Sequence, residues 1–167
     1  MFFYQNTYKV AAMDTYFIIK TLHIISSTIL FGTGIGIAFF MFRSHFTNDL
    51  HEKLYAARGT VLADYIFTFP AVIAQLVTGA WLVWQSGYDW LNLWLVSTYL
   101  IYAIVGLCWL PVVWIQIQLK KMLIRSVEEN MELPQRYHKL FKIWCILGWP
   151  AFIGLVVVFF LMVMKPV

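Results

Sequence analysis

Residues 18–40 read IIKTLHIISSTILFGTGIGIAFF, and this almost wholly apolar stretch decides the class of fold. A helix needs ~20 consecutive apolar residues to cross a bilayer, so the stretch is long enough for a transmembrane helix. A backbone in hydrocarbon must satisfy its own hydrogen bonds, which makes a helix the default there. The stretch also lacks the alternation of polar and apolar residues that is typical of membrane-barrel strands.

Three further stretches of the chain are equally apolar. We predict transmembrane helices at about residues 15–42, 60–85, 94–119 and 143–164. Only 12% of the 167 residues are charged and 62% are hydrophobic, whereas about 25% of a soluble domain is charged. The sequence therefore predicts an all-α fold, a transmembrane four-helix bundle. It forms a single integral-membrane domain over residues 1–167, with the lipid bilayer as its solvent.

The basic residues predict how the chain crosses the membrane. Two connections are rich in them, with Arg43, Lys53 and Arg58 after the first helix and Lys120, Lys121, Arg125, Arg136, Lys139 and Lys142 after the third. The short connection over residues 86–92 contains no lysine or arginine. The positive-inside rule then predicts both basic loops in the cytoplasm and both termini outside. This topology explains the net charge of +4, so no nucleic-acid partner is expected.

One ionisable side chain lies deep in the first predicted helix. His23 is about eight residues into the span, or ~12 Å below the outer surface at 1.5 Å per residue. Because an ionisable group is costly in a membrane, a metal ligand or proton carrier is the default hypothesis for it. A hydrogen-bonded core histidine is the alternative. The other histidines, His45, His51 and His138, lie in the basic loops, so a multi-histidine metal centre is not expected.

Several potential ligands are predicted at the depth of His23. Counting inward from the outer helix ends places Gln75, Tyr102 and Met162 in this layer, and Lys20 lies one turn above His23 on the same face. A single imidazole can hold haem iron. We therefore predict haem b as the cofactor, with His23 as the iron ligand and the other four residues around the haem. Lys20 would pair with a propionate, or would extend to the membrane surface.

Asp64 is the second charged residue inside a span, one turn into the second helix from the cytoplasmic side. It could cap the helix start, where the helix dipole favours an anion. It could also admit protons, or form a salt bridge with Arg58 or Lys142, and we favour the salt bridge. Three prolines inside the spans should kink their helices and open room for a cofactor. They are Pro70, Pro111 and Pro150.

Four blocks of the sequence carry a resemblance to known proteins. They read IKTLHIISSTILFGTGIGIAFF, VLADYIFTFPAVIAQLVTG, CWLPVVWIQIQLKK and YHKLFKIWCILGWPAFIGL. Over nearly the whole chain they resemble a family of small bacterial four-helix integral-membrane proteins of unknown function. This resemblance implies a location in the bacterial inner membrane and carries no activity with it.

The first helix and the C-terminal end also resemble a second family. KTLHIISSTILFGTG, the later Arg43, YHKLF and the final MKP block are similar to HemJ-type protoporphyrinogen oxidases, which are small four-helix membrane proteins. This resemblance implies that His23, with Lys20 before it, binds haem b, and that the reaction oxidises protoporphyrinogen IX to protoporphyrin IX. The middle helices, with LADYIFTFP and CWLPVVW, do not follow that family's pattern. The resemblance therefore supports haem binding more than the specific reaction.

Two functional hypotheses follow. The first is a haem b redox protein, an oxidoreductase that oxidises a porphyrin precursor or passes electrons to quinone, with Phe31, Phe159 and Phe160 as water-excluding walls. The second is a non-catalytic membrane protein, namely a small transporter, a proton relay or an assembly or stabilising subunit. The ionisable groups in the spans would then form a relay or interhelical hydrogen bonds. Because four helices leave lipid-facing surface all round, a second copy or a respiratory protein is a further candidate partner.

Overall fold

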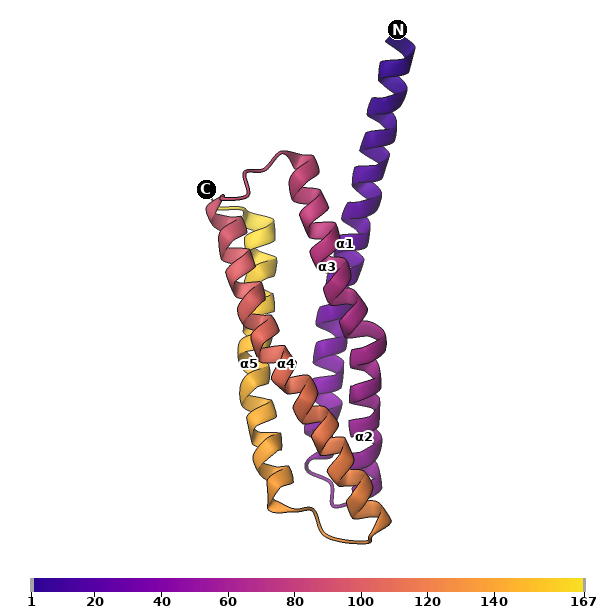
Figure 1. The fold of residues 1–167 in the computed structure, drawn as a ribbon, viewed down its shortest axis with the longest axis vertical. Coiled ribbons are helices and arrows are strands. Elements are labelled where there is room, and N and C mark those ends of the chain that lie inside the picture. The colour runs from indigo at the N-terminus through magenta and orange to yellow at the C-terminus, as the bar shows by residue number, and fades with distance from the viewer. Residues whose placement is uncertain (1, 167) are drawn as a thin grey trace.

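The computed structural model describes residues 2–166, with side chains over residues 13–166. It is all-α, as predicted, because every regular element in this range is helical (Figure 1). The elements are α1 (Phe2–Ser44), α2 (Leu50–Ala63), the π-helical turn η1 (Asp64–Thr68), α3 (Phe69–Ser86), α4 (Leu93–Glu128) and α5 (Gln135–Met164).

Four helical segments of the described chain are long and apolar enough to cross a membrane, which confirms the predicted number of spans. They are Met13–Ser44, Leu50–Ser86, Leu93–Glu128 and Gln135–Met164. The second of them contains α2, η1 and α3, which follow one another along the chain as one uninterrupted helical segment. Large apolar side chains such as Phe40, Leu107 and Val163 are mostly exposed. An apolar outer surface of this kind suits a protein that is surrounded by lipid.

The helices extend beyond the predicted spans. Residues 50–59 and 135–142, which were expected within the connections, are helical. At the start of α2 the carboxylate of Asp49 accepts a hydrogen bond from the backbone N–H of His51 at 2.8 Å. At the start of α5 the N–H of Tyr137 donates to the carbonyl of Pro134 at 2.9 Å. Such contacts satisfy groups that a helix end leaves unpaired, so polar segments continue the helices beyond the predicted apolar spans.

The helices associate as two pairs. α1 packs along α3, and α4 packs along α5, while α2 packs against both α1 and α4. α1 and α5 approach each other at few positions. The two pairs are joined most closely at the end where α2 lies (Figure 1).

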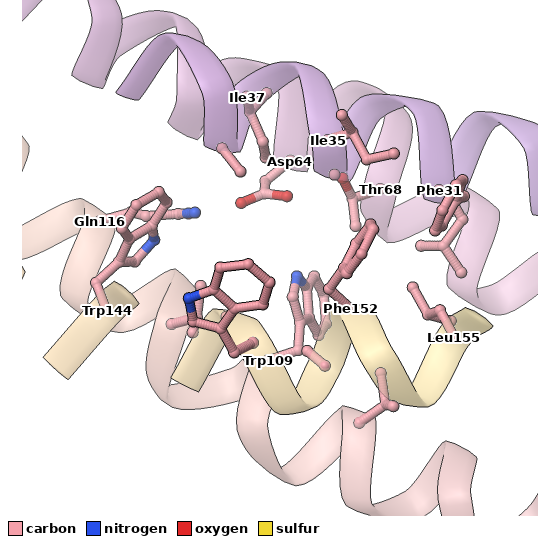
Figure 2. Close-up of a pocket in the computed structure, with 18 of the residues that line it drawn as sticks. Phe31, Ile35, Ile37, Asp64, Thr68, Trp109, Gln116, Trp144, Phe152 and Leu155 are labelled. Carbon is pink, nitrogen blue, oxygen red and sulfur yellow. The ribbon is translucent and has the colours of Figure 1, made fainter. Parts of the chain in front are cut away.

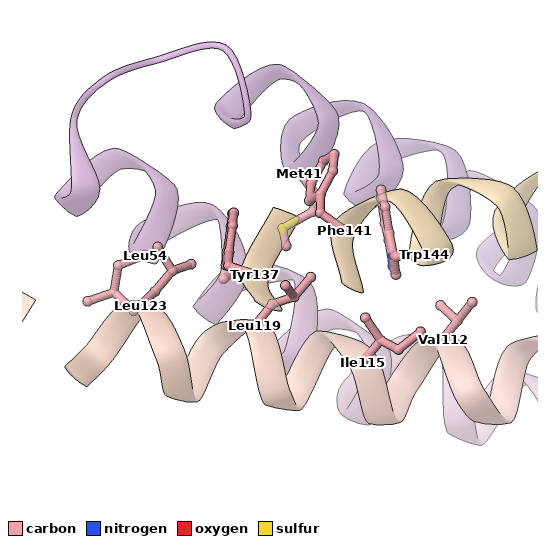
Figure 3. Packing of buried hydrophobic residues seen from close by; sticks show 10 residues of the cluster. Met41, Leu54, Val112, Ile115, Leu119, Leu123, Tyr137, Phe141 and Trp144 are labelled. Atoms are coloured by element: carbon pink, nitrogen blue, oxygen red, sulfur yellow. The ribbon is translucent and has the colours of Figure 1, made fainter. Parts of the chain in front are cut away.

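A buried apolar cluster joins the two pairs at this end (Figure 3). Met41 of α1, Leu54 of α2, Leu119 and Leu123 of α4, and Tyr137 of α5 are each at most 6% exposed. Burying one aliphatic side chain of this size contributes about 1.5–3 kcal/mol relative to leaving it in water. The cluster therefore fixes the positions of α1, α2, α4 and α5 relative to one another.

The basic residues that were expected in two connections lie in the helical segments beside those connections, at one end of the bundle. Figure 1 shows the α1–α2 and α4–α5 connections at this end, and the α3–α4 connection and the C-terminus at the other. The positive-inside rule requires such an arrangement. The assignment of the basic end to the cytoplasm stays a prediction.

Candidate functional site

A cavity of about 510 Å³ lies between the two helix pairs, and α1, η1, α3, α4 and α5 all contribute to its wall (Figure 2). Most of the wall is apolar, with Leu30, Phe31, Ile35, Val105, Phe152 and Leu155 among the lining residues. The polar side chains in the wall are Asp64, Thr68, Tyr102 and Gln116, together with the indoles of Trp109, Trp144 and Trp149. A largely apolar cavity of this size with a few polar groups is typical of small-molecule sites.

The turn η1 brings two polar side chains into this cavity. Pro70 follows the turn, and a proline offers no N–H to the carbonyl of Ile66 and crowds it with its ring. The backbone widens before Pro70, where the N–H of Phe69 donates to the carbonyl of Asp64 five residues earlier. The distortion expected at Pro70 thus takes the form of a π turn, which is rare and frequent at functional sites. Asp64 and Thr68 are each only 4% exposed.

The carboxyl group of Asp64 is surrounded by potential hydrogen-bond donors. Thr68, Trp109 and Gln116 face it from η1 and α4. Figure 2 shows the amide of Gln116 pointing toward the carboxyl, with the indole of Trp144 beside Gln116. The carboxyl oxygen Oδ2 nevertheless has no hydrogen-bond partner.

The predicted salt bridge of Asp64 is wrong. Within the part of the chain whose side chains are described, no ion pair involves Asp64. The two expected partners, Arg58 and Lys142, lie on the exposed surface of their helices. Their side chains therefore remain on the outside of the bundle, whereas the π turn directs Asp64 into it.

Five polar atoms in the cavity wall are buried without a hydrogen-bond partner. They are Asp64 Oδ2, Thr68 Oγ1, Trp109 Nε1, Gln116 Oε1 and Trp144 Nε1. A buried polar group that is left unpaired costs about 1–3 kcal/mol, and the hydrocarbon core offers no water to replace the missing partner. Because both donors and acceptors are present, this end of the cavity can bind the polar part of a molecule whose remainder is apolar.

Sequence reasoning placed Asp64 in the second span but missed the polar residues that surround it. Those residues come from η1, α4 and α5, so no spacing rule along one segment could group them. One local signal was present in LADYIFTFP, where Asp64 and Thr68 are four residues apart and Pro70 follows. A proline at that place predicts a distorted turn, and the distortion decides which way both polar side chains point.

His23 lies at a contact between α1 and α3, apart from the cavity wall. Thr78 donates its hydroxyl hydrogen to the carbonyl of Ala74. The hydrogen in the 2.8 Å contact between Thr78 Oγ1 and His23 Nδ1 must therefore come from the imidazole. A Cβ atom at Gly79 would lie 3.2 Å from the ring, so glycine lets α3 approach His23 closely. Gln75 donates to the backbone carbonyl of His23 at 2.6 Å.

Of the four residues predicted around the haem, Gln75 contacts His23. The other three, Lys20, Tyr102 and Met162, contact different parts of the bundle. Lys20 extends over an aromatic ring of its own helix, with Nζ 5.7 Å from the ring centroid. Tyr102 lines the cavity and donates its hydroxyl to a backbone carbonyl of α3 at 3.3 Å. Met162 packs against a small apolar cluster formed by α3 and α4.

The hydrogen bond at Nδ1 is compatible with a histidine that would hold haem iron through its other ring nitrogen. Because Nδ1 carries the hydrogen, Nε2 holds the free lone pair, and metal-binding histidines are commonly held in this way by a second hydrogen bond. Among the residues with described side chains, no group of three or more His, Cys, Asp or Glu is placed to hold a metal ion.

Comparison with known proteins identifies the family. Residues 17–166 match the family described as predicted integral membrane protein (DUF2269), and the chain therefore belongs to this family. The match confirms the resemblance to a small membrane family of unknown function. No curated protein and no solved structure matches the chain, so the resemblance to HemJ-type oxidases stays an expectation from the sequence.

Proposed function

We propose that this member of the DUF2269 family of integral membrane proteins binds a small amphipathic molecule inside the bilayer. The observation that carries the proposal is the cavity between the helix pairs, with five unpartnered polar atoms in its wall, Asp64 Oδ2 among them. A molecule with an apolar body and a polar head would pair these atoms and fill the apolar remainder of the cavity.

An empty cavity lacks two kinds of favourable contact. Five polar atoms of its wall have no hydrogen-bond partner within the protein, and side chains around a void lose dispersion contacts on one side. Proteins break such local rules mainly at functional sites. A bound molecule would supply both kinds of contact, which supports a ligand as the reason for the arrangement.

The cavity opens between α1 and α5. Phe39 and Phe42 on α1 and Trp149 on α5 belong to its wall and are each at least half exposed. Because this surface belongs to the membrane-spanning segments, the ligand would enter from the hydrocarbon and would be soluble in lipid. This route favours the non-catalytic alternative, a small transporter or carrier.

A cavity-filling variant tests the proposal. Gly34 lines the cavity, and a Cβ added there meets no atom within 4 Å, so Gly34→Leu would fill the cavity without a backbone clash. The matched control is Gly32→Leu, on the same helix, exposed and outside the cavity wall. In native mass spectrometry we expect the wild type and Gly32→Leu to retain a small molecule and Gly34→Leu to lose it. Equal retention by both variants, or none by the wild type, would overturn the proposal.

Haem b binding at His23 is a second candidate function, favoured by the hydrogen bond between Nδ1 and Thr78. Haem supplies one-electron chemistry when it is bound. In this role His23 would hold the iron through Nε2, Thr78 would fix the tautomer and orientation of the imidazole, and Lys20 would be available for a propionate. Oxidation of a porphyrin precursor or electron transfer to quinone would then be the associated oxidoreductase activity.

An absorption spectrum tests this second candidate. The purified protein is measured oxidised and dithionite-reduced, with a pyridine haemochrome assay. We expect a Soret band with near-stoichiometric haem b, which His23→Ala abolishes and His138→Ala retains. A protein that stays colourless after haem is offered would exclude the haem candidate and would leave the cavity proposal unaffected.

A further inference from the structure

Among the described residues that line the cavity there is one carboxyl group and no cationic side chain to balance it. Resting on the proposed function, we propose that the ligand is an apolar organic cation. Its positive charge, on an ammonium or similar group, lies against the carboxyl of Asp64, and its apolar body fills the rest of the cavity.

The charge of Asp64 is not balanced inside the wall. No lysine, arginine or histidine is among the described residues that line the cavity. The other ionisable side chains of the lining are Tyr102 on α4 and Cys145 on α5, and neither carries a positive charge in any protonation state. A buried carboxylate without a cation is costly. A proton or a positively charged ligand is therefore the compensating charge that Asp64 requires.

The wall near this carboxyl is also aromatic. Trp109 faces Asp64 from α4, Trp144 lies beside Gln116, and Trp149 lines the cavity farther along α5 (Figure 2). The face of an indole attracts cations more strongly than other aromatic faces, and the attraction grows when water is excluded. A carboxylate in a wall that also holds indoles therefore matches a cation, and the aliphatic remainder of the wall matches an apolar body.

The same features disfavour other ligands. An anion would meet the charge of Asp64 where water and salt screen the repulsion little. A neutral molecule would leave the carboxylate without a compensating charge, unless a proton occupied it. Since one carboxyl cannot hold a proton and pair fully with a cation, the two compete for Asp64. The affinity for the cation should therefore rise as the pH rises.

A pair of probes with the same shape and opposite charge provides the test. Tetraphenylphosphonium and tetraphenylborate are offered to the detergent-purified full chain in equilibrium dialysis. The variants are Asp64→Asn, which removes the charge at constant shape, and Asp89→Asn, which changes an exposed aspartate in the α3–α4 connection. We expect the wild type and Asp89→Asn to bind the phosphonium with similar affinity. We expect Asp64→Asn to bind it at least about tenfold more weakly.

The outcomes separate the inference from the proposed function. Equal phosphonium affinity in Asp64→Asn, or a preference for tetraphenylborate, would overturn the inference. If Gly34→Leu still loses a retained molecule in that case, the cavity binds a neutral ligand or an anion and the proposed function stands. If Asp64→Asn does not fold, the wild type decides alone, because it must then bind tetraphenylphosphonium more tightly than tetraphenylborate, the probe of the same shape and opposite charge. Equal affinity for the two probes would refute the inference.

Discussion

His23 Nδ1 lies 2.8 Å from the hydroxyl oxygen of Thr78, across the contact between α1 and α3. Thr78 also donates to the carbonyl of Ala74, so its oxygen accepts the imidazole hydrogen. The bond links the two helices of one pair and fixes which nitrogen of His23 is free. A structural role and a ligand role for His23 are therefore compatible, since the first uses Nδ1 and the second would use Nε2.

Thr78→Val should destabilise the protein because it removes this acceptor and leaves the Nδ1–H group without a partner. A buried donor that loses its partner costs about 1–3 kcal/mol. The measurement is the thermal unfolding midpoint in detergent. Thr28→Val is the control, because Thr28 is exposed and bonds only to a carbonyl of its own helix, that of Ile24, at 2.9 Å. Equal midpoints for the two variants would show that the interhelical bond contributes nothing measurable.

Gly154→Ala should loosen the pair formed by α4 and α5. A Cβ atom at Gly154 would lie 2.6 Å from Val105 Cγ2 and 3.3 Å from Ile101 Cγ2. The first distance is too short for two carbon atoms, so the helices must move apart or Val105 must leave its rotamer. Overpacking of this kind costs about 1–3 kcal/mol.

The matched control for this variant is Gly148→Ala on the same helix, where an added Cβ meets nothing within 4 Å. Alanine is favoured over glycine inside a helix by about 1 kcal/mol. We therefore expect a lower unfolding midpoint for Gly154→Ala and an equal or higher one for Gly148→Ala. A stabilised Gly154→Ala protein would mean that the two helices are not held as closely as described.

The number of spans could be predicted because it depends on a local property of the chain. The apolar length of residues 18–40 is visible in the sequence and requires a helix in any bilayer. The extension of the helices at 50–59 and 135–142 was harder to predict. It depends on polar segments that have neither membrane length nor a strong apolar face, and on caps such as Asp49.

The polar group of the cavity could not be predicted from any one segment. Asp64, Gln116 and Trp144 lie on separate helices, and their meeting depends on how each helix is rotated about its axis. The π turn changes that rotation for α2 relative to α3, because an added residue turns the helix by about 100°. The depth of His23 and Gln75 was predicted from residue counts, and the structure places the two in contact. The same counting could not reveal that Lys20 and Met162 face other neighbours.

His45 should make stability depend on pH. It lies in the α1–α2 connection and stacks on Phe141 with a centroid distance of 4.1 Å. Burial, and the positive charges of Lys53 and His138 nearby, lower the pKa of His45 from its usual 6.5. The unfolded chain therefore binds more protons than the folded one below about pH 7, and the free energy of unfolding falls as the pH falls through 6.5.

The thermal unfolding midpoint, followed from about pH 7.5 to about pH 5.5, measures this effect. His45→Asn should show a smaller loss over that range than the wild type, because its side chain does not take up a proton. His51→Asn changes an exposed histidine of α2 and should keep the wild-type profile. If His45→Asn lost as much stability as the wild type on acidification, the pH dependence would have to come from other groups.

Tyr137→Phe should leave the protein as stable as the wild type or make it more stable. Tyr137 is fully buried in the cluster that joins the helix pairs, and its hydroxyl has no hydrogen-bond partner. Removing an unpaired buried hydroxyl removes its desolvation penalty and keeps the ring contacts, including the stacking on Phe141 with a centroid distance of 6.2 Å.

Tyr102→Phe is the matched comparison, because the hydroxyl of Tyr102 donates to the carbonyl of Val72 at 3.3 Å. The loss of that bond should cost about 0.5–1.5 kcal/mol, measured as a lower midpoint of thermal unfolding. A destabilised Tyr137→Phe protein would show that its hydroxyl has a partner, such as an ordered water.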